Sequence, residues 1–378
     1  MIINNVKLVL ENEVVHGSLE MQDGEIRTFA ESQSRLPEAM DGEGGWLLPG
    51  LIELHTDNLD KFFTPRPKVD WPAHSAMSSH DALMVASGIT TVLDAVAIGD
   101  VRDGGDRLEN LEKMINAIEE TQKRGVNRAE HRLHLRCELP HHTTLPLFEK
   151  LVQREPVTLV SLMDHSPGQR QFANREKYRE YYQGKYSLTD AQMQQYEEEQ
   201  LALAARWSQP NRETIAALCR ARQIALASRD DATHAHVAES HQLGSVIAEF
   251  PTTFEAAEAS RRHGMNVLMG APNIVRGGSH SGNVAASELA QLGLLDILSS
   301  DYYPASLLDA AFRVADDQSN RFTLPQAVKL VTKNPAQALN LQDRGVIGEG
   351  KRADLVLAHR KGNHIHIDHV WRQGKRVF

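Results

Sequence analysis

Residues 48–57 read LPGLIELHTD, an apolar run that follows a Pro-Gly pair and ends in an imidazole and a carboxylate. The run predicts a strand over residues 46–54. Side chains alternate along a strand, so His55 and Asp57 at its end are expected to point the same way. This stretch therefore predicts a strand that presents two polar groups on one side of its carboxyl end.

The same pattern recurs along the middle of the chain. We predict eight strands, over residues 46–54, 90–95, 131–139, 157–163, 224–228, 246–250, 266–270 and 295–300. Most are followed by a predicted helix, over residues 80–87, 108–124, 145–154, 212–222, 253–263, 285–292 and 303–316. This alternation predicts an α/β fold of the (β/α)8 barrel type. A doubly wound open sheet is the structural alternative, but no stretch resembles its Gly-rich phosphate-binding turn.

The two ends of the chain have a different character. Short strands separated by turns are predicted at residues 6–10, 14–21, 25–27, 353–358, 365–367 and 370–372. We expect them to meet in one small β-sandwich of residues 1–46 and 345–378, next to a barrel of residues 47–344. Two unrelated terminal hairpins are the alternative.

One segment interrupts the strand–helix alternation. Residues 169–211 are long, polar and helix-prone, with several arginines, lysines and tyrosines. We predict a helical insertion after the fourth barrel strand. It is either a lid that helps to bind an anion or a solvated hairpin without a function, and the sequence favours neither.

Composition limits the class of protein. Among 378 residues, 41 Lys and Arg against 50 Asp and Glu leave a formal net charge of −9, which disfavours a general nucleic-acid binder. Cys137 and Cys219 are the two cysteines, which indicates a reducing compartment rather than a disulfide scaffold. No apolar run is long enough for a membrane helix, and the first residues lack the zones of a signal peptide. We therefore expect a cytoplasmic enzyme with a large core.

Imidazoles and carboxylates follow several predicted strands, where the catalytic groups of a barrel gather. They are His55, Asp57, Glu138, Asp164, His165, Asp230, Asp231 and Asp301. A single His or Asp at a strand end is more often a hydrogen-bonded cap. Convergence of this many on one barrel mouth predicts a site for Zn²⁺ or another divalent transition metal. Cys137 is expected to face the other way and to be a buried structural thiol.

The sequence resembles the amidohydrolase superfamily over its whole length. The resemblance rests on the stretch at 48–57, with Asp57 in place of a second histidine, and on NPA at 334–336, GVI at 345–347 and GKRADLV at 350–356. It implies a metal-dependent barrel with a β-sandwich made from both chain ends. Asp301 corresponds to the strand-eight aspartate, which takes a proton from the attacking water and contacts the metal.

Four further stretches are similar to the PhnM family, the hydrolases of phosphonate metabolism in the carbon–phosphorus lyase pathway. They read HTDNLDK at 55–61, PRPKVDWP at 65–72, LMDHSPGQ at 162–169 and GAPNIVRGGSHSGN at 270–283. This family releases pyrophosphate from α-D-ribose 1-methylphosphonate 5-triphosphate and leaves the 5-phosphate. The resemblance thus implies a phosphorylated sugar as substrate and a metal, Zn with Mn or Fe as alternatives. It is compatible with a homodimer and with transient contacts to other enzymes of the pathway.

We assign candidate roles on that basis. His55 and Asp57 are expected to hold the metal, with Glu138 and His165 as further ligands or as groups that support the ligands. A polyanionic substrate on an acidic protein needs local positive charge. Three segments supply it, through Lys61, Arg66 and Lys68, through His234 and His236, and through Arg276, Gly277, Gly278 and His280. Solvated loops, a flexible turn and surface histidines are the plain alternatives, and metal ligation also competes at His234 and His236.

Residues 228–231 depart from the family pattern. They read SRDD, where a metal-binding histidine is expected at the position of Arg229. A guanidinium keeps its proton and has no lone pair to offer, so it cannot be a ligand. Either Asp230 compensates or the chain binds metal poorly. A different metal hydrolase of this fold, acting on an amide, a cyclic amide or a deaminase substrate, and a non-catalytic barrel scaffold therefore stay as alternatives.

Overall fold

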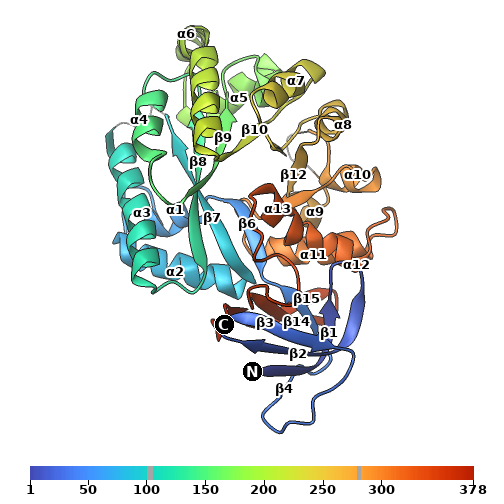
Figure 1. Ribbon diagram of the computed structural model, residues 1–378. Helices are drawn as coiled ribbons and strands as arrows, with labels where there is room; N and C mark the ends of the chain where they lie inside the picture. Colours follow the sequence, from blue (N-terminus) through green and yellow to red (C-terminus); the bar gives the residue numbers. More distant parts are fainter. Residues whose placement is uncertain (100–104, 279–281) are drawn as a thin grey trace. The chain divides into compact units, whose positions relative to one another are not determined.

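The computed structural model describes residues 1–99, 105–278 and 282–378, and it contains two large sheets (Figure 1). The first is mixed and the second has eight strands in chain order. The predicted fold class, a (β/α)8 barrel with a small sheet domain from both chain ends, is confirmed.

The small sheet joins the two ends of the chain. Its order is β16-β15-β14-β5-β1-β2-β3, with β4 paired to β1. The strands are β1 Ile2–Val9, β2 Val14–Gln22, β3 Glu25–Ala30, β4 Met40–Asp41, β5 Trp46–Pro49, β14 Leu355–Lys361, β15 His364–Arg372 and β16 Lys375–Arg376. β14 pairs antiparallel with β5, so the blue and red strands of Figure 1 lie side by side. Their alternating inward side chains, such as Leu8, Leu47 and Trp371, form one apolar core.

The barrel sheet runs in the order β13-β12-β11-β10-β9-β8-β7-β6. Its strands are β6 Leu51–Thr56, β7 Ile89–Ile98, β8 Glu130–Glu138, β9 Val157–Met163, β10 Ala225–Arg229, β11 Ile247–Glu249, β12 Asn266–Gly270 and β13 Ile297–Ser299. A parallel bridge between Thr56 and Asp301 links the first strand to the residues after the last. This link closes the ladder and brings the ends of β6 and β13 together.

The predicted strand over 46–54 is in fact two strands in two sheets. β5 pairs with β1 and β14, whereas β6 pairs with β7. The chain changes sheets at Gly50, where an added Cβ atom would lie 2.1 Å from Oγ1 of Thr90. Only glycine fits this close approach, so the sequence signal of one long strand conceals a crossing point between sheets.

Helices follow most barrel strands, as the alternation predicts. They are α1 Asn58–Phe63, α2 Ala73–Ala86, α3 Gly105–Arg124, α4 Thr144–Leu151, η1 Arg170–Phe172, α5 Arg175–Tyr186, α6 Asp190–Arg222, α7 His234–Gln242, α8 Phe254–Arg262, α9 Ala271–Arg276, α10 Ala286–Gln291, α11 Ser306–Asp316, α12 Leu324–Lys329 and α13 Lys333–Ala338. The predicted helix at 212–222 is only the last part of α6, which continues through Pro210. Within the described residues, no helix is both long and apolar enough to cross a bilayer.

The chain divides into two compact units by its internal contacts. Unit 1 comprises Met1–Asp94, Glu112–Arg132 and Met269–Phe378, and unit 2 comprises Ala95–Leu111 and Leu133–Leu268. Unit 2 carries the helical insertion as η1, α5 and α6. At its turn, Thr189 and Gln192 form a reciprocal capping box that starts α6.

Candidate metal and phosphate site

Three of the predicted metal ligands come together in unit 1. His55 lies at the end of β6, Asp57 precedes α1, and Asp301 follows β13. The Nε2 atom of His55 lies 3.9 Å from Oδ1 of Asp57 and 3.9 Å from Oδ1 of Asp301. The imidazole is buried, whereas both carboxylates are about one-third exposed. The group therefore has a buried nitrogen donor and two oxygen donors that solvent and substrate can reach.

A third carboxylate, Glu53, holds this group in place. It accepts hydrogen bonds from the backbone N–H of His55 at 2.8 Å and from that of Ser300 at 2.6 Å. Burial raises the pKa of Glu53 to about 7, against the effect of these N–H donors. One side chain thus ties the residue before Asp301 to the residue that supplies the imidazole. Our sequence analysis missed Glu53, although it precedes His55 by two residues and so shares its side of the strand.

Two predicted phosphate-binding cations of unit 1 converge next to Asp301. The Nζ atom of Lys61 donates to the carbonyl oxygen of Tyr302 at 2.6 Å, and Nη1 of Arg276 lies 3.5 Å from the hydroxyl of Tyr302. Lys61 and Arg276 come from α1 and α9, more than 200 residues apart in the chain. Tyr302, the residue after Asp301, therefore contacts both cations, a role that the sequence does not reveal.

The other predicted phosphate contacts of unit 1 lie differently. Gly277 ends α9 with a φ of 82°, and the N–H groups of Gly277 and Gly278 donate to the carbonyl of Asn273 at 3.2 and 3.0 Å. This turn closes a helix, so its N–H groups already have an acceptor. His280 lies outside the described residues.

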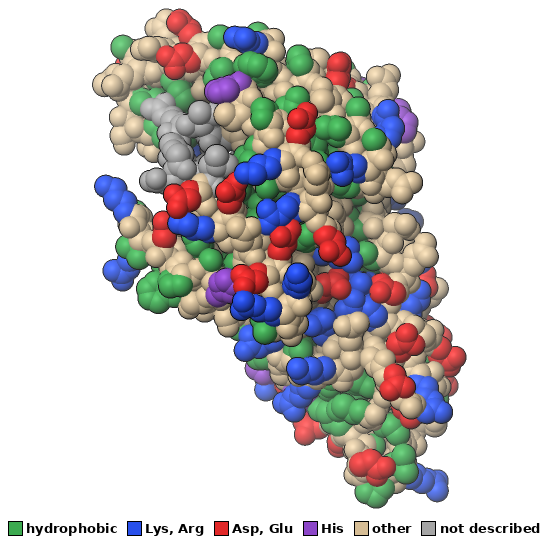
Figure 2. Space-filling view, turned by 60° about the vertical axis from the view of Figure 1, so that its left-hand side comes forward, with side chains coloured by type: hydrophobic (Ala, Val, Ile, Leu, Met, Phe, Trp, Pro, Cys, Tyr) green, Lys and Arg blue, Asp and Glu red, His purple; other side chains and the backbone are tan. Residues whose placement is uncertain are grey.

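Arg66 and Lys68 are exposed on a turn that Arg66 and Val69 close by a bridge. Acidic and basic side chains are intermixed on the face that Figure 2 shows, so exposure by itself does not distinguish a phosphate contact. Within unit 1, Lys61 and Arg276 are the candidates that contact Tyr302, the residue after Asp301.

Unit 2 pairs its two predicted ligands with one another. His165 forms an ion pair with Glu138 through Nδ1, and its Nε2 lies 3.7 Å from Oδ2 of Asp230. Burial disfavours both charges, but the pairing outweighs it: the pKa of Glu138 falls to about 2 and that of His165 rises to about 9. Arg229 turns to Asp230, with Nε 3.5 Å from Oδ2, and its guanidinium lies over the ring of Phe250. Asp230 thus stands between an imidazolium and a guanidinium.

The two histidines of α7 have local partners. His234 pairs with Glu255 at 3.2 Å on an exposed surface. The Nδ1 atom of His236 accepts the backbone N–H of Ala232 at 3.1 Å. Burial and the nearby Arg170 lower the pKa of His236, which favours its neutral ring. A neutral imidazole is a poor partner for phosphate.

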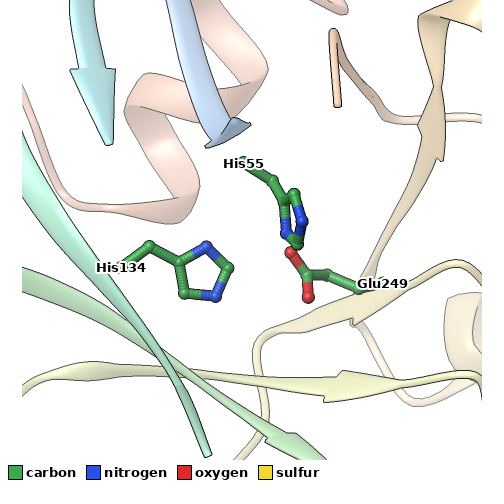
Figure 3. Close-up of side chains that lie close together, drawn as sticks. All are labelled: His55, His134 and Glu249. Atoms are coloured by element: carbon green, nitrogen blue, oxygen red, sulfur yellow. The ribbon is translucent and has the colours of Figure 1, made fainter. Parts of the chain in front are cut away.

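Two further polar residues of unit 2 were missed by the sequence analysis. His134, from β8, and Glu249, from β11, point toward one another, with ligand atoms within 4.8 Å (Figure 3). Both side chains are buried, and Nε2 of His134 also lies 2.8 Å from Oγ of Ser161. His55, from β6 of unit 1, is the third residue drawn in Figure 3. The one feature of the sequence that could have indicated them is their position, since both polar residues lie within predicted barrel strands.

Comparison with known proteins assigns the family. The sequence pattern described as "Amidohydrolase family" matches residues 82–378. The chain belongs to the amidohydrolase family. It is 98% identical over 378 residues, the whole of both chains, to the alpha-D-ribose 1-methylphosphonate 5-triphosphate diphosphatase of Escherichia coli strain K12.

Solved structures of other amidohydrolases share the fold. N-acetyl-D-glucosamine-6-phosphate deacetylase from Mycobacterium smegmatis matches at 15% identity with a TM-score of 0.64, covering 100% of both chains. N-isopropylammelide isopropylaminohydrolase from Burkholderia multivorans matches at 17% identity with a TM-score of 0.64, covering 100% of this chain and 97% of the other. At this identity the likeness concerns the fold alone.

Amidohydrolases depend on a metal, and the residues present in unit 1 fit one. One imidazole nitrogen and two carboxylate oxygens, from His55, Asp57 and Asp301, lie within 4.8 Å of one another. This donor set suits Zn²⁺, Mn²⁺ or Fe²⁺. The separations of 3.9 Å between the nitrogen and each oxygen are longer than hydrogen bonds, as expected for groups arranged around an ion.

Proposed function

We propose that this chain releases pyrophosphate from α-D-ribose 1-methylphosphonate 5-triphosphate and leaves the 5-phosphate. The observation that carries the proposal is the 98% identity, over the full length, to a diphosphatase of that name. The geometry of unit 1 supports it, because two cations contact Tyr302, the residue that follows Asp301 of the carboxylate–imidazole group, and a polyanionic substrate requires such cations.

In this proposal His55, Asp57 and Asp301 hold a divalent metal, most simply Zn²⁺ with Mn²⁺ or Fe²⁺ as alternatives. When bound, such an ion lowers the pKa of a coordinated water and polarises a phosphoryl oxygen. Glu138 and His165 remain candidates for further ligands, although they pair with one another in unit 2. The metal and these residue roles are tested by the experiments below.

The protein's own groups complete the reaction. A carboxylate of Asp301 takes the proton of the attacking water, whose oxygen bonds to the α-phosphorus. The bond from that phosphorus to the bridging oxygen breaks, and pyrophosphate leaves with both electrons of that bond. Lys61 and Arg276, gathered at Tyr302, offset the negative charge that develops on it. Glu53 accepts the backbone N–H groups of His55 and Ser300, and so holds His55 and the backbone before Asp301 in position during this step.

Pyrophosphate release from a substrate panel tests the proposal. The panel contains the ribose 1-methylphosphonate 5-triphosphate, a nucleoside triphosphate, a cyclic ureide and an N-acyl amino acid, each with metal-loaded and chelator-treated protein. We expect metal-dependent pyrophosphate from the first compound. Turnover of an amide instead would assign a different hydrolase of this fold, and no turnover with any metal would indicate a scaffold.

We also propose a cytoplasmic protein that forms a homodimer and makes transient contacts with other enzymes of phosphonate breakdown. The reason for the proposed location is that an enzyme acting on a small phosphorylated molecule works in the compartment in which that molecule is formed. Sedimentation of the purified protein at micromolar concentration tests the dimer directly.

A further inference from the structure

Unit 2 contains a cavity of about 510 Å³ between the ends of β8 and β9 and the helical hairpin of α5 and α6. Glu138 and His165 line it from the barrel side. Tyrosines, glutamines and Lys185 line it from the hairpin, which is the insertion that interrupts the strand–helix alternation. The volume lies in the range of small-molecule sites.

The hairpin side of the cavity is a packed wall of tyrosines. The rings of Tyr182 and Tyr186 stack with centroids 5.9 Å apart, and Tyr196 of α6 lies 5.7 and 5.8 Å from them. Beneath them, Phe172, Tyr178 and Met193 form a buried apolar cluster. Burial raises the pKa of Tyr182, so its hydroxyl stays neutral. The tyrosine wall is therefore packed by its own contacts and does not depend on a bound ligand.

Lys185 places a positive charge on this wall. Its Nζ lies 5.2 Å from the ring centroid of Tyr186 and 5.9 Å from that of Tyr182. In the described part of the chain, no carboxylate lies within ion-pair distance of this ammonium group. Arg175 and Arg179 of the same helix differ, because both face Glu197. Lys185 is thus a cation held over aromatic faces with its remaining donors available.

Amide groups and one carboxylate complete the polar lining. Gln192, Gln195, Glu199 and Gln200 of α6 line the cavity. The amide oxygen of Gln192 accepts the backbone N–H of Thr189, and Gln195 donates to Glu199 at 3.1 Å, so their remaining donors and acceptors, with those of Gln200, face a ligand. Hydroxyl groups of a sugar match such groups, and an anion matches the ammonium group. A ribose carrying a phosphonate monoanion combines both features.

We propose that this cavity recognises the ribose 1-methylphosphonate part of the substrate, with Lys185 pairing the phosphonate oxygens. The inference rests on the proposed function and deepens it. It names the group that distinguishes this substrate from ordinary triphosphates. The main competing occupant is a nucleobase, which tyrosines and glutamines also suit.

Binding of α-D-ribose 1-methylphosphonate tests the inference without requiring turnover. We expect calorimetry to show binding to the metal-loaded wild-type protein and a loss of about tenfold or more in affinity in Lys185→Gln. Lys185→Arg should keep most of the affinity because the charge is kept. Lys177→Gln, an exposed lysine of the same helix that does not line the cavity, is the matched control.

Kinetics separate this inference from the proposed function. Lys185→Gln should raise KM for the ribose 1-methylphosphonate 5-triphosphate about tenfold, with kcat little changed, and should leave KM for ribose 5-triphosphate unaltered. An equal change for both triphosphates, or tight adenosine binding that competes with the phosphonate, overturns the inference. If wild-type protein binds the phosphonate but releases no pyrophosphate, the proposed function fails and the cavity assignment stands.

Discussion

Unit 1 contains two groups of histidine and aspartate with nearly the same composition and opposite environments. In the first, the carboxylates of Asp57 and Asp301 are about one-third exposed and stand 3.9 Å from Nε2 of His55. In the second, His80, Asp94 and His131 are fully buried, and His131 also contacts Asp81. Both groups have donor atoms close enough to hold an ion.

Hydrogen bonding distinguishes them. In the buried group, His80 bonds Asn58 at 3.1 Å and Asp94 at 2.6 Å, while His131 bonds Asp94 at 2.8 Å and Asp81 at 2.9 Å. Every ring nitrogen there has a partner at hydrogen-bond distance, and no solvent reaches it. An ion would have to replace these bonds. We infer that the buried group stabilises the fold, whereas the partly exposed group is arranged for chemistry.

Removing a charge from the buried group is expected to have the largest effect. Asp94→Asn should lower the free energy of unfolding by about 3–5 kcal/mol, because it leaves buried histidines without their anion. Urea denaturation measures the loss, with Asp309→Asn, whose carboxylate pairs with Arg313 on the surface of α11, as a control. If Asp94→Asn were as stable as wild type but inactive, the two groups would have exchanged roles.

The partly exposed group should respond in the reverse way. Asp301→Asn should keep the stability of the fold and lower kcat for pyrophosphate release by roughly 10²-fold or more, since the proton acceptor is lost. A chelator should abolish release, and Zn²⁺ or Mn²⁺ should restore it in wild type. Near-normal turnover in Asp301→Asn would place the base elsewhere.

The pH dependence of stability sharpens the same contrast. Burial disfavours a charged His131, but Asp94 and Asp81 outweigh burial and raise its pKa to about 9. A raised pKa in the folded state contributes stability that is complete below pH ~6.5 and is lost as the pH rises through about 9. Unfolding free energies between pH 6 and 9.5 should therefore fall, and fall less steeply in Asp94→Asn. A flat profile in wild type contradicts a charged His131.

The smallest expected effect concerns Arg229. Its side chain is already turned to Asp230 and Phe250, so Arg229→His should leave stability nearly unchanged. If β10 supplies a ligand, the imidazole should raise metal content and kcat/KM by about tenfold. Metal analysis and kinetics of both proteins, prepared in parallel, give the answer. Equal metal and equal turnover would exclude residue 229 as a ligand position.

Much of the site could be predicted from strand ends. The alternation of a strand places His55 and Asp57 on one side, and a closed barrel brings Asp301 next to them. Glu53, Tyr302 and His134 could not be assigned in the same way. Their partners, such as Ser300 for Glu53, lie up to 247 residues away in the sequence. Local patterns carry no information about such pairs.

The sequence by itself determined the strand–helix alternation and the small sheet at the chain ends. It also determined that the side chain of Arg229 has no lone pair with which to bind a metal. These depend on periodicity and on side-chain chemistry, which are local properties. Only the tertiary structure decided which histidines have every ring nitrogen hydrogen-bonded and which stand beside partly exposed carboxylates. That distinction follows from how many hydrogen-bond partners the packed chain brings to each ring. For His131 both partners, Asp81 and Asp94, come from segments distant in sequence.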